Sequence, residues 1–375
     1  MKIEDVIIVG GGLAGLTAAI DLARSGHKVH LFEAKEYPQH KVCGEYVSNE
    51  VIPYLQHLGV NVFHHGAVYI DQLQISDSQG RLAKSPLPMG GFGLSRFEFD
   101  RLLFARATAL GVQIKILKVA RIQFAKDIFT VTTTDGQSHF AKVVIGAYGK
   151  RSNLDKDLER PFAYKKQSWL AVKSHYNEAE HPGNVVGLHN FEGGYGGLSR
   201  TETGMVNFCY LAHYHTFKQY NGVADFNRKV VAKNPHLARF LSQATPTFSE
   251  PLTIAQISFD EKATVENHVL MAGDSAGLIH PLCGNGMAMA IHSAKLAAGV
   301  VRRFLDSRRP HRAKMEKRYR KEWDKAFRQR LWYGRKLQGI LMNAKYMDLG
   351  IRMARSSTAL MRQVITRTHG KTLVP

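Results

Sequence analysis

A run of glycines close to the N-terminus constrains the fold more than any other feature of the sequence. It follows a short continuous apolar run, residues 6–9 (VIIV), which is typical of a parallel strand covered on both faces. Gly10, Gly12 and Gly15 then form the pattern G-x-G-x-x-G at the start of a segment with helical periodicity. A second apolar run ends on Glu33. Strand, turn, helix and strand in this order predict a βαβ unit and therefore an α/β fold.

Each glycine of this turn has a physical role in binding a dinucleotide. Gly10 allows the tight turn, Gly12 lets backbone N–H groups approach a pyrophosphate, and Gly15 lets the helix pack closely on the strand. The positive end of the helix faces the anion. Glu33 is placed to accept hydrogen bonds from a ribose. A glycine triplet alone fits any tight strand-to-helix turn, but with these neighbours it predicts a dinucleotide site, for either NAD or FAD.

A second glycine-rich turn, in residues 269–287 (VLMAGDSAGLIHPLCGNGM), favours FAD. A buried strand is expected to end at Gly273 and Asp274, and a helix to begin near Gly286. Two helix N-termini from distant parts of the chain would hold one long ligand. Asp274 would hydrogen-bond ribityl hydroxyls, and the second helix N-terminus would face the flavin ring, where its dipole favours the anionic reduced form. The small side chains of the turn let the backbone approach the cofactor.

The length and the cysteines limit the class of protein. A chain of 375 residues predicts two domains that share an interface. The three cysteines have no CxxC spacing, which argues against a disulfide framework and a structural zinc site and favours a reducing, cytoplasmic compartment. The N-terminal apolar run lacks the basic start and cleavage site of a signal peptide. No stretch of about eighteen uninterrupted apolar residues is present, so no membrane-spanning helix is expected.

Positive charge is concentrated at the C-terminal end. The whole chain has a net charge of +20, and residues 302–375 carry 21 Lys and Arg against 5 Asp and Glu. Apolar residues recur there at helical spacing, which predicts two or three helices that form a cap. Its basic face is either simply solvated or rests on an anionic membrane surface, which would make the protein peripheral on the inner face of a membrane. Nucleic acid is not expected as a partner, because no binding motif accompanies the charge.

The middle of the chain has a different pattern. Strands of mixed polarity follow one another in residues 169–176, 184–191, 195–199 and 204–214, which predicts an antiparallel sheet in a substrate domain. Three aromatic residues of these strands, Tyr195, Phe208 and Tyr210, are candidates for the substrate pocket, although aromatic residues more often form core. The expected boundaries are residues 1–65, 94–160 and 262–301 for an FAD-binding domain, 66–93 and 161–261 for the substrate domain, and 302–375 for the cap.

With these residues in place, the chain resembles the FAD-dependent monooxygenases of the para-hydroxybenzoate hydroxylase fold, in the branch that includes the geranylgeranyl reductases. Four motifs carry the resemblance, and they cover the chain to about residue 300. They are the glycine pattern ending in Glu33; KVCGE, residues 41–45; R-x-x-F-D-x-x-L, from Arg96 to Leu103; and G-D-x-A-x-x-x-x-P-x-x-G-x-G, matched by Gly273, Asp274, Ala276, Pro281, Gly284 and Gly286.

The resemblance implies a Rossmann-like, glutathione reductase-type FAD-binding domain with an antiparallel-sheet substrate domain. It implies that Arg96 lies near the FAD and that Cys43, Gly44 and Glu45 lie beside the flavin, with Cys43 and Glu45 as the candidates for catalysis. The cofactor contacts expected on all these grounds are Gly10, Gly12, Gly15, Glu33, Cys43, Gly44, Arg96, Gly273, Asp274, Pro281, Gly284 and Gly286.

The sequence departs from the family pattern in three places. Tyr148 stands where the hydroxylases have an aspartate associated with cofactor binding, which puts the docking of NAD(P)H in doubt. In the geranylgeranyl reductase signature Tyr-x-Trp-x-Phe-Pro, Tyr195 is kept but Gly197 and Ser199-Arg200 replace the bulky residues. The Trp-x-Trp-x-Ile-Pro stretch of the related halogenases is missing. Hydroxylation is therefore favoured over prenyl reduction, and both over halogenation.

No metal site is expected from the histidines. His175, His189, His213, His215 and His280 have no Asp, Glu or Cys partner at ligand spacing. His280 lies in the turn that should face the flavin, where backbone hydrogen bonding and proton transfer are equally plausible roles. Cys283 lies in the same turn and is expected either to pack or to approach the ring.

We therefore expect an FAD-dependent oxidoreductase. In the favoured hypothesis NAD(P)H reduces the FAD, and one oxygen atom of O2 is transferred to a small lipophilic substrate, of aromatic or polyketide type. The alternative is a flavin ene reductase that acts on a polyprenyl chain. A third reading, a membrane-surface or nucleic-acid-binding module with FAD as a structural ligand, predicts no NAD(P)H oxidation with any substrate.

Overall fold

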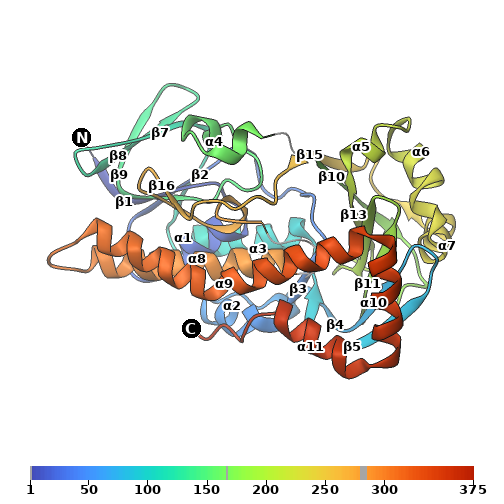
Figure 1. Ribbon diagram of the computed structural model, residues 1–375. Coiled ribbons are helices and arrows are strands. Elements are labelled where there is room, and N and C mark those ends of the chain that lie inside the picture. Colours follow the sequence, from blue (N-terminus) through green and yellow to red (C-terminus); the bar gives the residue numbers. More distant parts are fainter. Residues whose placement is uncertain (1, 166–167, 279–284) are drawn as a thin grey trace.

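The computed structural model describes residues 2–165, 168–278 and 285–375. Two sheets lie side by side, and the long helix α9 (Arg312–Met342) runs across both of them (Figure 1). The C-terminus returns to the side of the first sheet, near helix α2 (Ile52–His57) (Figure 1).

The first sheet contains the predicted βαβ unit. Its central strands are parallel: β1 (Ile3–Val9) pairs with β2 (Val29–Glu33) and β9 (Ser138–Gly146), and β9 pairs with β17 (Val269–Met271). Helix α1 (Leu13–Arg24) begins directly after Gly12, as expected, and contains Gly15 in its first turn. In order across the sheet, the strands are β16 (Val265–Glu266), β17 (Val269–Met271), β9 (Ser138–Gly146), β1 (Ile3–Val9), β2 (Val29–Glu33) and β6 (Gln113–Ile116), with β7 (Val119–Ala125) and β8 (Ile128–Thr133) joined to β9.

The second sheet is formed mainly by the middle of the chain. Its strands pair in antiparallel fashion except for β11 and β4, which run parallel, so the expectation of an antiparallel sheet holds with one exception. The order is β14 (Thr245–Pro246), β10 (Trp169–Asn177), β13 (Val206–His213), β12 (Gly194–Arg200), β11 (Val185–Phe191), β4 (Val68–Ser76), β5 (Leu82–Gly93) and β3 (Tyr46–Ser48), with β15 (Leu252–Ile257) beside β10. Strand β3 joins this sheet although it precedes residue 65.

Helices cover the outer surfaces of both sheets. Side chains alternate across a strand, so one face of the second sheet turns to the first sheet and the other packs on helices. Aromatic side chains of the latter face contact α6 (Gly222–Lys229) and α7 (Pro235–Gln243). The other α-helices that precede the C-terminal segment are α1 (Leu13–Arg24), α3 (Arg96–Ala109), α4 (Leu154–Asp157), α5 (Tyr214–Phe217), α6 (Gly222–Lys229), α7 (Pro235–Gln243) and α8 (Gly286–Leu305).

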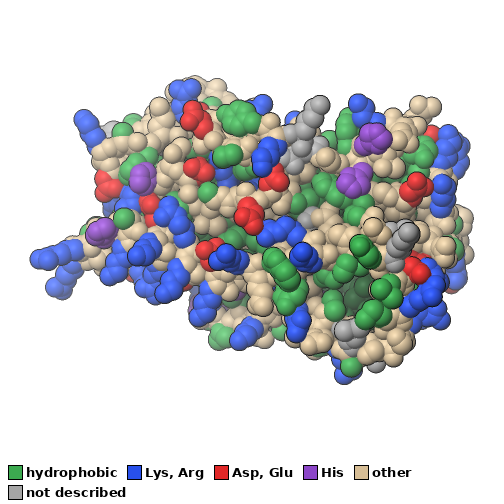
Figure 2. All heavy atoms as spheres, viewed as in Figure 1, with side chains coloured by type: hydrophobic (Ala, Val, Ile, Leu, Met, Phe, Trp, Pro, Cys, Tyr) green, Lys and Arg blue, Asp and Glu red, His purple; other side chains and the backbone are tan. Residues whose placement is uncertain are grey.

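The basic C-terminal segment forms three helices, α9, α10 (Ala344–Ser356) and α11 (Thr358–Thr368). Helix α9 packs on α8, while α10 and α11 contact β5 of the second sheet. Tyr319, Trp323 and Leu373 belong to the same core as the first sheet, so the segment is integrated into the fold. Lys and Arg side chains follow α9 across the visible face (Figure 2). Among the described residues no helix has the length and apolar character needed to cross a membrane.

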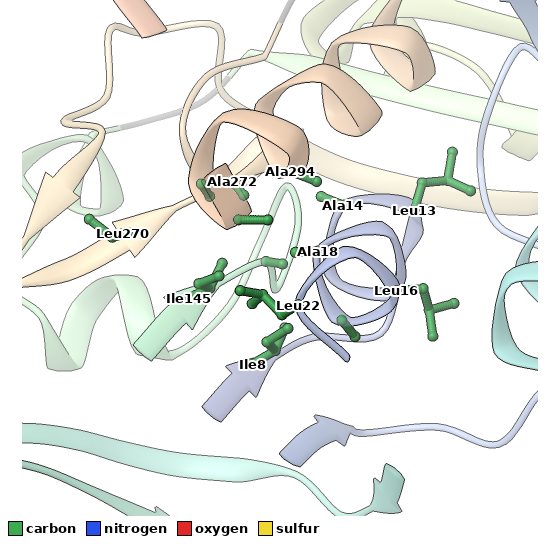
Figure 3. Close-up of a cluster of buried hydrophobic side chains, with 14 of the residues drawn as sticks. Ile8, Leu13, Ala14, Leu16, Ala18, Leu22, Ile145, Leu270, Ala272 and Ala294 are labelled. Atoms are coloured by element: carbon green, nitrogen blue, oxygen red, sulfur yellow. The ribbon is translucent and has the colours of Figure 1, made fainter. Parts of the chain in front are cut away.

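The core of the first sheet positions two helix N-termini at one edge. Ile8, Ile145 and Leu270 come from the adjacent parallel strands β1, β9 and β17 and are fully buried. They gather with Ala18 of α1 and Ala294 of α8 (Figure 3). Alanines at the contact let α1 and α8 pack closely together, and both helices begin near the carboxyl ends of these strands.

Candidate functional site

The first glycine turn has the geometry that its sequence predicts. Gly10 has φ +102°, and a Cβ atom there would lie 2.4 Å from the Ala147 carbonyl oxygen at the end of the neighbouring strand. A Cβ on Gly15 would lie 1.9 Å from the Gly10 carbonyl oxygen. Only glycine fits either position, because each faces backbone that cannot move aside. With glycine at both positions, the chain can turn sharply at the end of β1 and begin α1 close to the carboxyl end of that strand.

Gly12 differs because the space beside it is open. The nearest described atom to its hypothetical Cβ is Nη2 of Arg96, at 3.6 Å. Arg96 is held by Asp100, with both nitrogen-to-oxygen distances at 2.9 Å, and Lys41 contacts the same carboxylate at 2.8 Å. Open backbone at a helix N-terminus beside an arginine suits a pyrophosphate. This cradle fits the FAD that the sequence implies.

Glu33 lies at the end of β2, next to this cradle. Its carboxylate accepts hydrogen bonds from the backbone N–H groups of Gly11, at 2.7 Å, and Lys35, at 3.2 Å. A carboxylate has about four acceptor positions, so two bonds leave capacity for ribose hydroxyls. Glu33 therefore borders the same cavity as Gly12 and keeps free acceptor positions there.

The second turn touches the first. Gly273 has φ +62°, and a Cβ there would lie 3.0 Å from the Cβ of Ala14 in α1 and 3.6 Å from that of Ala290 in α8. Asp274 follows it and borders the same cavity as Gly10 and Gly12. Helix α8 begins at Gly286, as predicted. Pro281 and Gly284, with His280 and Cys283, lie outside the described residues.

Arg160 contacts this second turn, although the sequence did not indicate a role for it. It is 1% exposed, and its guanidinium donates to the Ser275 and Ala263 carbonyl oxygens, both at 2.9 Å, and to Asp155 at 2.8 Å. Because one side chain joins these three segments, Arg160 holds the Asp274 turn in place. It also lies 3.5 Å from the hydroxyl of Tyr148. No local pattern marks Arg160 as part of the site, since the two carbonyl oxygens that it binds are more than 100 residues away.

A cavity of about 880 Å³ connects the two turns with the second sheet. It extends from Gly12 and Glu33, past Cys43 and Asp274, to apolar residues of the second sheet such as Leu211. Its volume lies in the range of about 300–1,000 Å³ that is usual for ligand sites. One long cofactor and a substrate would share it.

The loop formed by Cys43, Gly44 and Glu45 borders this cavity and is hydrogen-bonded to the second sheet. Asn207 donates to the Cys43 carbonyl oxygen at 3.2 Å, and Ser199 donates to the Gly44 carbonyl oxygen at 2.9 Å. Ser199 is one of the residues that depart from the reductase signature, and here it anchors the loop. The structure thus places Cys43, Gly44 and Glu45 at the border of the same cavity as Gly12 and Asp274.

Glu45 is the centre of a buried charge network. Its carboxylate contacts Nζ of Lys173 and Nε2 of His175, each at 2.5 Å, and accepts the backbone N–H of Arg96 at 2.7 Å. Burial alone favours the neutral acid, but the Lys173 ammonium and the His175 ring hold the pKa of Glu45 below its ordinary value. Since its oxygens are occupied, Glu45 is built to position the loop rather than to donate a proton.

Lys173 and His175 were not expected at the site. Both lie on β10 and face the cavity side of the sheet, where an apolar strand would normally present apolar side chains. A lysine and a histidine two residues apart, on a strand that begins with apolar residues, are the sequence signal for them. The partner carboxylate lies 128 residues away from Lys173, which no local pattern reveals.

Three described residues approach metal-ligand geometry, namely His40, Glu45 and His175, whose ligand atoms lie within 4.8 Å of one another. The Lys173 ammonium already neutralises this carboxylate, so the group does not need a cation. The remaining histidines are apart from it: His189 pairs with Ser76 at 2.9 Å, and His213 stacks on Trp169 at 4.0 Å between ring centroids. His215 is exposed.

The three expected substrate residues are placed differently. Tyr195 and Tyr210 are among the residues that border the cavity, but the Tyr210 ring packs against Phe191 and Phe226 on the helix-covered face. Phe208 does not line the cavity that the structure describes: it packs against Phe240 and Tyr176 on the opposite face. The prediction for Phe208 was wrong because side chains alternate along β13, and its neighbour Cys209 takes the cavity side.

Comparisons with known proteins agree with this geometry. The sequence model of a family described as an FAD binding domain matches residues 4–312. Conditioned medium factor receptor 1 of Dictyostelium discoideum is 23% identical over 361 residues, which cover 86% of this chain and 68% of that protein. Menaquinone reductase of Mycobacterium tuberculosis is 24% identical, covering 81% and 77%. Hispidin-3-hydroxylase of Neonothopanus nambi is 26% identical, covering 77% and 78%.

The fold is also shared with solved structures. A geranylgeranyl bacteriochlorophyll reductase-like protein of Thermoplasma acidophilum superposes with a TM-score of 0.78 at 19% sequence identity, covering 98% of this chain and 96% of that one. The expected α/β fold, with a Rossmann-like part and a second sheet, is confirmed.

Proposed function

Because the chain belongs to the FAD binding domain family, we propose that it is a NAD(P)H-dependent flavin monooxygenase that hydroxylates a small lipophilic substrate, of aromatic or polyketide type. The observation that carries the proposal is the continuity of one cavity, from the cofactor cradle at Gly12 to the apolar face of the second sheet. We further propose that the domains divide at the boundaries expected from the sequence, with β3 contributed to the second sheet.

The residues of the chain have separate tasks in this reaction. FAD, when bound, would supply the redox chemistry by which NAD(P)H, a proton, O2 and the substrate become NAD(P)+, water and the hydroxylated product. Gly10, Gly12 and Glu33, with Arg96 and Asp274, bind the cofactor. Ala171, Tyr195 and Leu211 form an apolar wall that orients the substrate and excludes water.

The loop residues Cys43, Gly44 and Glu45 lie between these two parts. Glu45 fixes the loop through Lys173 and His175, so that the main chain of Gly44 keeps a constant place at the cavity. Cys43 borders the cavity with its thiol free, and it is the loop side chain we propose to contact the substrate or the flavin.

Ene reduction of a polyprenyl chain is the second candidate. It is favoured by the KVCGE loop and by relatives that are named reductases. The products separate the two reactions. A hydroxylase adds one oxygen atom derived from 18O2 and stops without air, whereas an ene reductase adds two hydrogen atoms and proceeds without air. Mass spectrometry of the product formed with NAD(P)H therefore decides between them, and reduction under nitrogen contradicts the monooxygenase proposal.

We also propose that the basic cap rests on anionic lipid at the inner face of the membrane. Helix α10 has two apolar sides: Met347 and Ile351 are buried, whereas Tyr346, Leu349 and Met353 are 60%, 56% and 47% exposed. Hydrophobic side chains gather over the ends of α9 and α10, with Lys and Arg around them (Figure 2). Trp332 and Ile340 of α9 are exposed as well. An apolar ridge among cations matches a negatively charged lipid surface.

Liposome sedimentation tests the lipid proposal. The protein is expected to sediment with vesicles that contain phosphatidylglycerol and to be released by high salt, with weaker sedimentation for Leu349→Ser. The control is Ile116→Ser, because Ile116 is 44% exposed on β6, at the edge of the first sheet. Equal partitioning to the supernatant with anionic and neutral vesicles contradicts this proposal and leaves the enzymatic one intact.

A further inference from the structure

Two polar atoms without partners lie at the part of the cavity formed by the C-terminal segment. The walls there are apolar and come from the second sheet, with Leu73, Leu87 and Val186. Tyr46 and His369 border the same cavity. Neither the Tyr46 hydroxyl nor Nε2 of His369 meets a hydrogen-bond partner among the described residues, and both atoms are buried. Buried polar atoms are normally paired, so these two call for a ligand.

Tyr46 provides a donor. It is 6% exposed on β3, and its ring is seated against Gly91, where a Cβ atom would lie 2.3 Å from the ring. Burial and the nearby Glu50 carboxylate raise the pKa of Tyr46, so its hydroxyl keeps its proton. Glu50 does not take this proton, because Arg330 and the Gly370 N–H occupy its oxygens.

His369 provides an acceptor, and its tautomer follows from its neighbour. Nδ1 lies 2.9 Å from the Ile365 carbonyl oxygen, which can only accept, so Nδ1 carries the proton and donates. Nε2 is then left with a lone pair. Burial lowers the pKa of His369, which keeps the ring neutral. The histidine follows directly after α11, and Asn285, which precedes α8, donates to the adjacent Thr368 carbonyl oxygen at 2.8 Å.

The two residues belong to one neighbourhood. Ile365, one helical turn before His369, packs in the same apolar cluster as Tyr46 and Leu87. Glu50 influences the titration of both Tyr46 and His369. We propose that Tyr46 and His369 form a subsite for a hydroxyl group on an otherwise lipophilic ligand. Tyr46 donates a hydrogen bond to the hydroxyl oxygen, and Nε2 of His369 accepts a hydrogen bond from the hydroxyl group. This inference rests on the proposed function, since it names the ligand group that the same cavity selects.

The pair discriminates between ligands by hydrogen-bonding capacity. A hydroxyl satisfies both atoms at once. An ether or a ketone oxygen accepts from Tyr46 but leaves Nε2 of His369 unpaired, and the end of a polyprenyl chain satisfies neither. Leaving a buried polar atom unpaired is costly, so the subsite favours hydroxylated over methylated or hydrocarbon ligands.

The probes 4-propylphenol and 4-propylanisole test this subsite. They differ only in the methyl group that replaces the hydroxyl proton. Each is titrated by calorimetry into the oxidised, FAD-loaded protein without NAD(P)H, so that binding is measured without turnover. The phenol is expected to bind about tenfold more tightly than the ether. The ratio should fall to about one in His369→Phe, and both probes should weaken in Tyr46→Phe.

The matched control is Tyr176→Phe, because Tyr176 is buried on the opposite face of the second sheet, away from the cavity. It is expected to keep the tenfold ratio, and FAD content is measured in every variant. Equal affinity of the two probes for the unchanged protein, as expected if only a water bridges the two atoms, overturns the proposal. Failure of both probes to bind overturns it as well. Neither result touches the proposed function, which depends on FAD uptake and on the oxygen content of the product.

Discussion

The two walls of the cavity are built from opposite kinds of chemistry. The wall at the first sheet depends on glycines, which have no side chain. At Gly10 and Gly15 the neighbouring backbone leaves no room for a Cβ atom, and the open space beside Gly12 leaves room for a ligand. The wall at the second sheet presents apolar side chains such as Ala171 and Leu211 to the cavity. Behind them Lys173 of this sheet pairs with Glu45 of the loop, and both side chains are fully enclosed. The first wall binds through backbone, and the second positions its loop through paired charge.

This difference teaches where each wall is vulnerable. Adding atoms damages the first wall, because its contacts are backbone against backbone or backbone against cofactor. Removing atoms damages the second, because a buried charge without its partner is costly. Four predictions, ordered by the size of the expected effect, test whether the walls differ in this way.

Lys173→Met should have the largest effect, on the stability of the fold. It leaves the Glu45 carboxylate buried beside His175 without its ammonium partner, and we expect a loss of about 3–5 kcal/mol in the free energy of unfolding. Lys142→Met is the control, because Lys142 contacts Asp5 at a similar distance of 2.8 Å on the surface, where about 0–1 kcal/mol is expected. Urea denaturation measures both, and equal losses would remove the distinction between buried and exposed pairs.

Gly10→Ala and Gly12→Ala should separate folding from cofactor binding in the first wall. Gly10→Ala forces a Cβ toward the Ala147 carbonyl at positive φ, so we expect about 1–3 kcal/mol of destabilisation together with loss of FAD. Gly12→Ala should leave the stability of the apoprotein nearly unchanged but weaken FAD binding at least about tenfold, which is about 1.4 kcal/mol. Thermal unfolding and FAD titration are measured on both. Unchanged FAD affinity in Gly12→Ala would contradict the claim that FAD binds against the backbone at Gly12.

Acid should weaken the second sheet through His189. Burial, with His236 and His181 nearby, lowers the pKa of His189 to about 3 from an ordinary value near 6.5. The folded state therefore binds fewer protons than the unfolded state below pH 6.5, and stability is present above that pH and falls as the pH drops. The loss should be about 1 kcal/mol between pH 6.5 and 5.5. In His189→Gln the free energy of unfolding should depend less steeply on pH over this range. An unchanged pH dependence would mean that other groups cause the loss of stability.

Ser199→Ala should have the smallest effect. It removes the hydrogen bond to the Gly44 carbonyl oxygen and so loosens one of the fastenings of the loop, for about 0.5–1.5 kcal/mol. FAD affinity should be kept, while KM for the substrate rises because the loop borders the cavity. Steady-state kinetics measures the change in KM, and urea denaturation measures the change in the free energy of unfolding. A loss of FAD with unchanged KM would place the loop in the first wall instead of between the walls.

The difference between the walls also explains what the sequence could predict. The glycine turns, Glu33, Asp274 and the start of α8 follow from local spacing, because backbone geometry depends on neighbouring residues. Lys173, His175 and Arg160 meet partners more than 100 residues away in several of their contacts, and such pairings depend on tertiary structure. Phe208 was assigned to the wrong face because the residues along β13 are apolar on both sides, so alternation gave no signal.

Equilibrium titration of the apoprotein with FAD, followed by flavin fluorescence and repeated with NAD, tests the central claim most directly. The account predicts one FAD bound per chain, no comparable binding of NAD at the same concentrations, and a clear loss of FAD affinity in Gly12→Ala. A protein that binds no FAD, or that binds it equally well with Gly12 replaced, would contradict the claim that the two turns hold this cofactor between them.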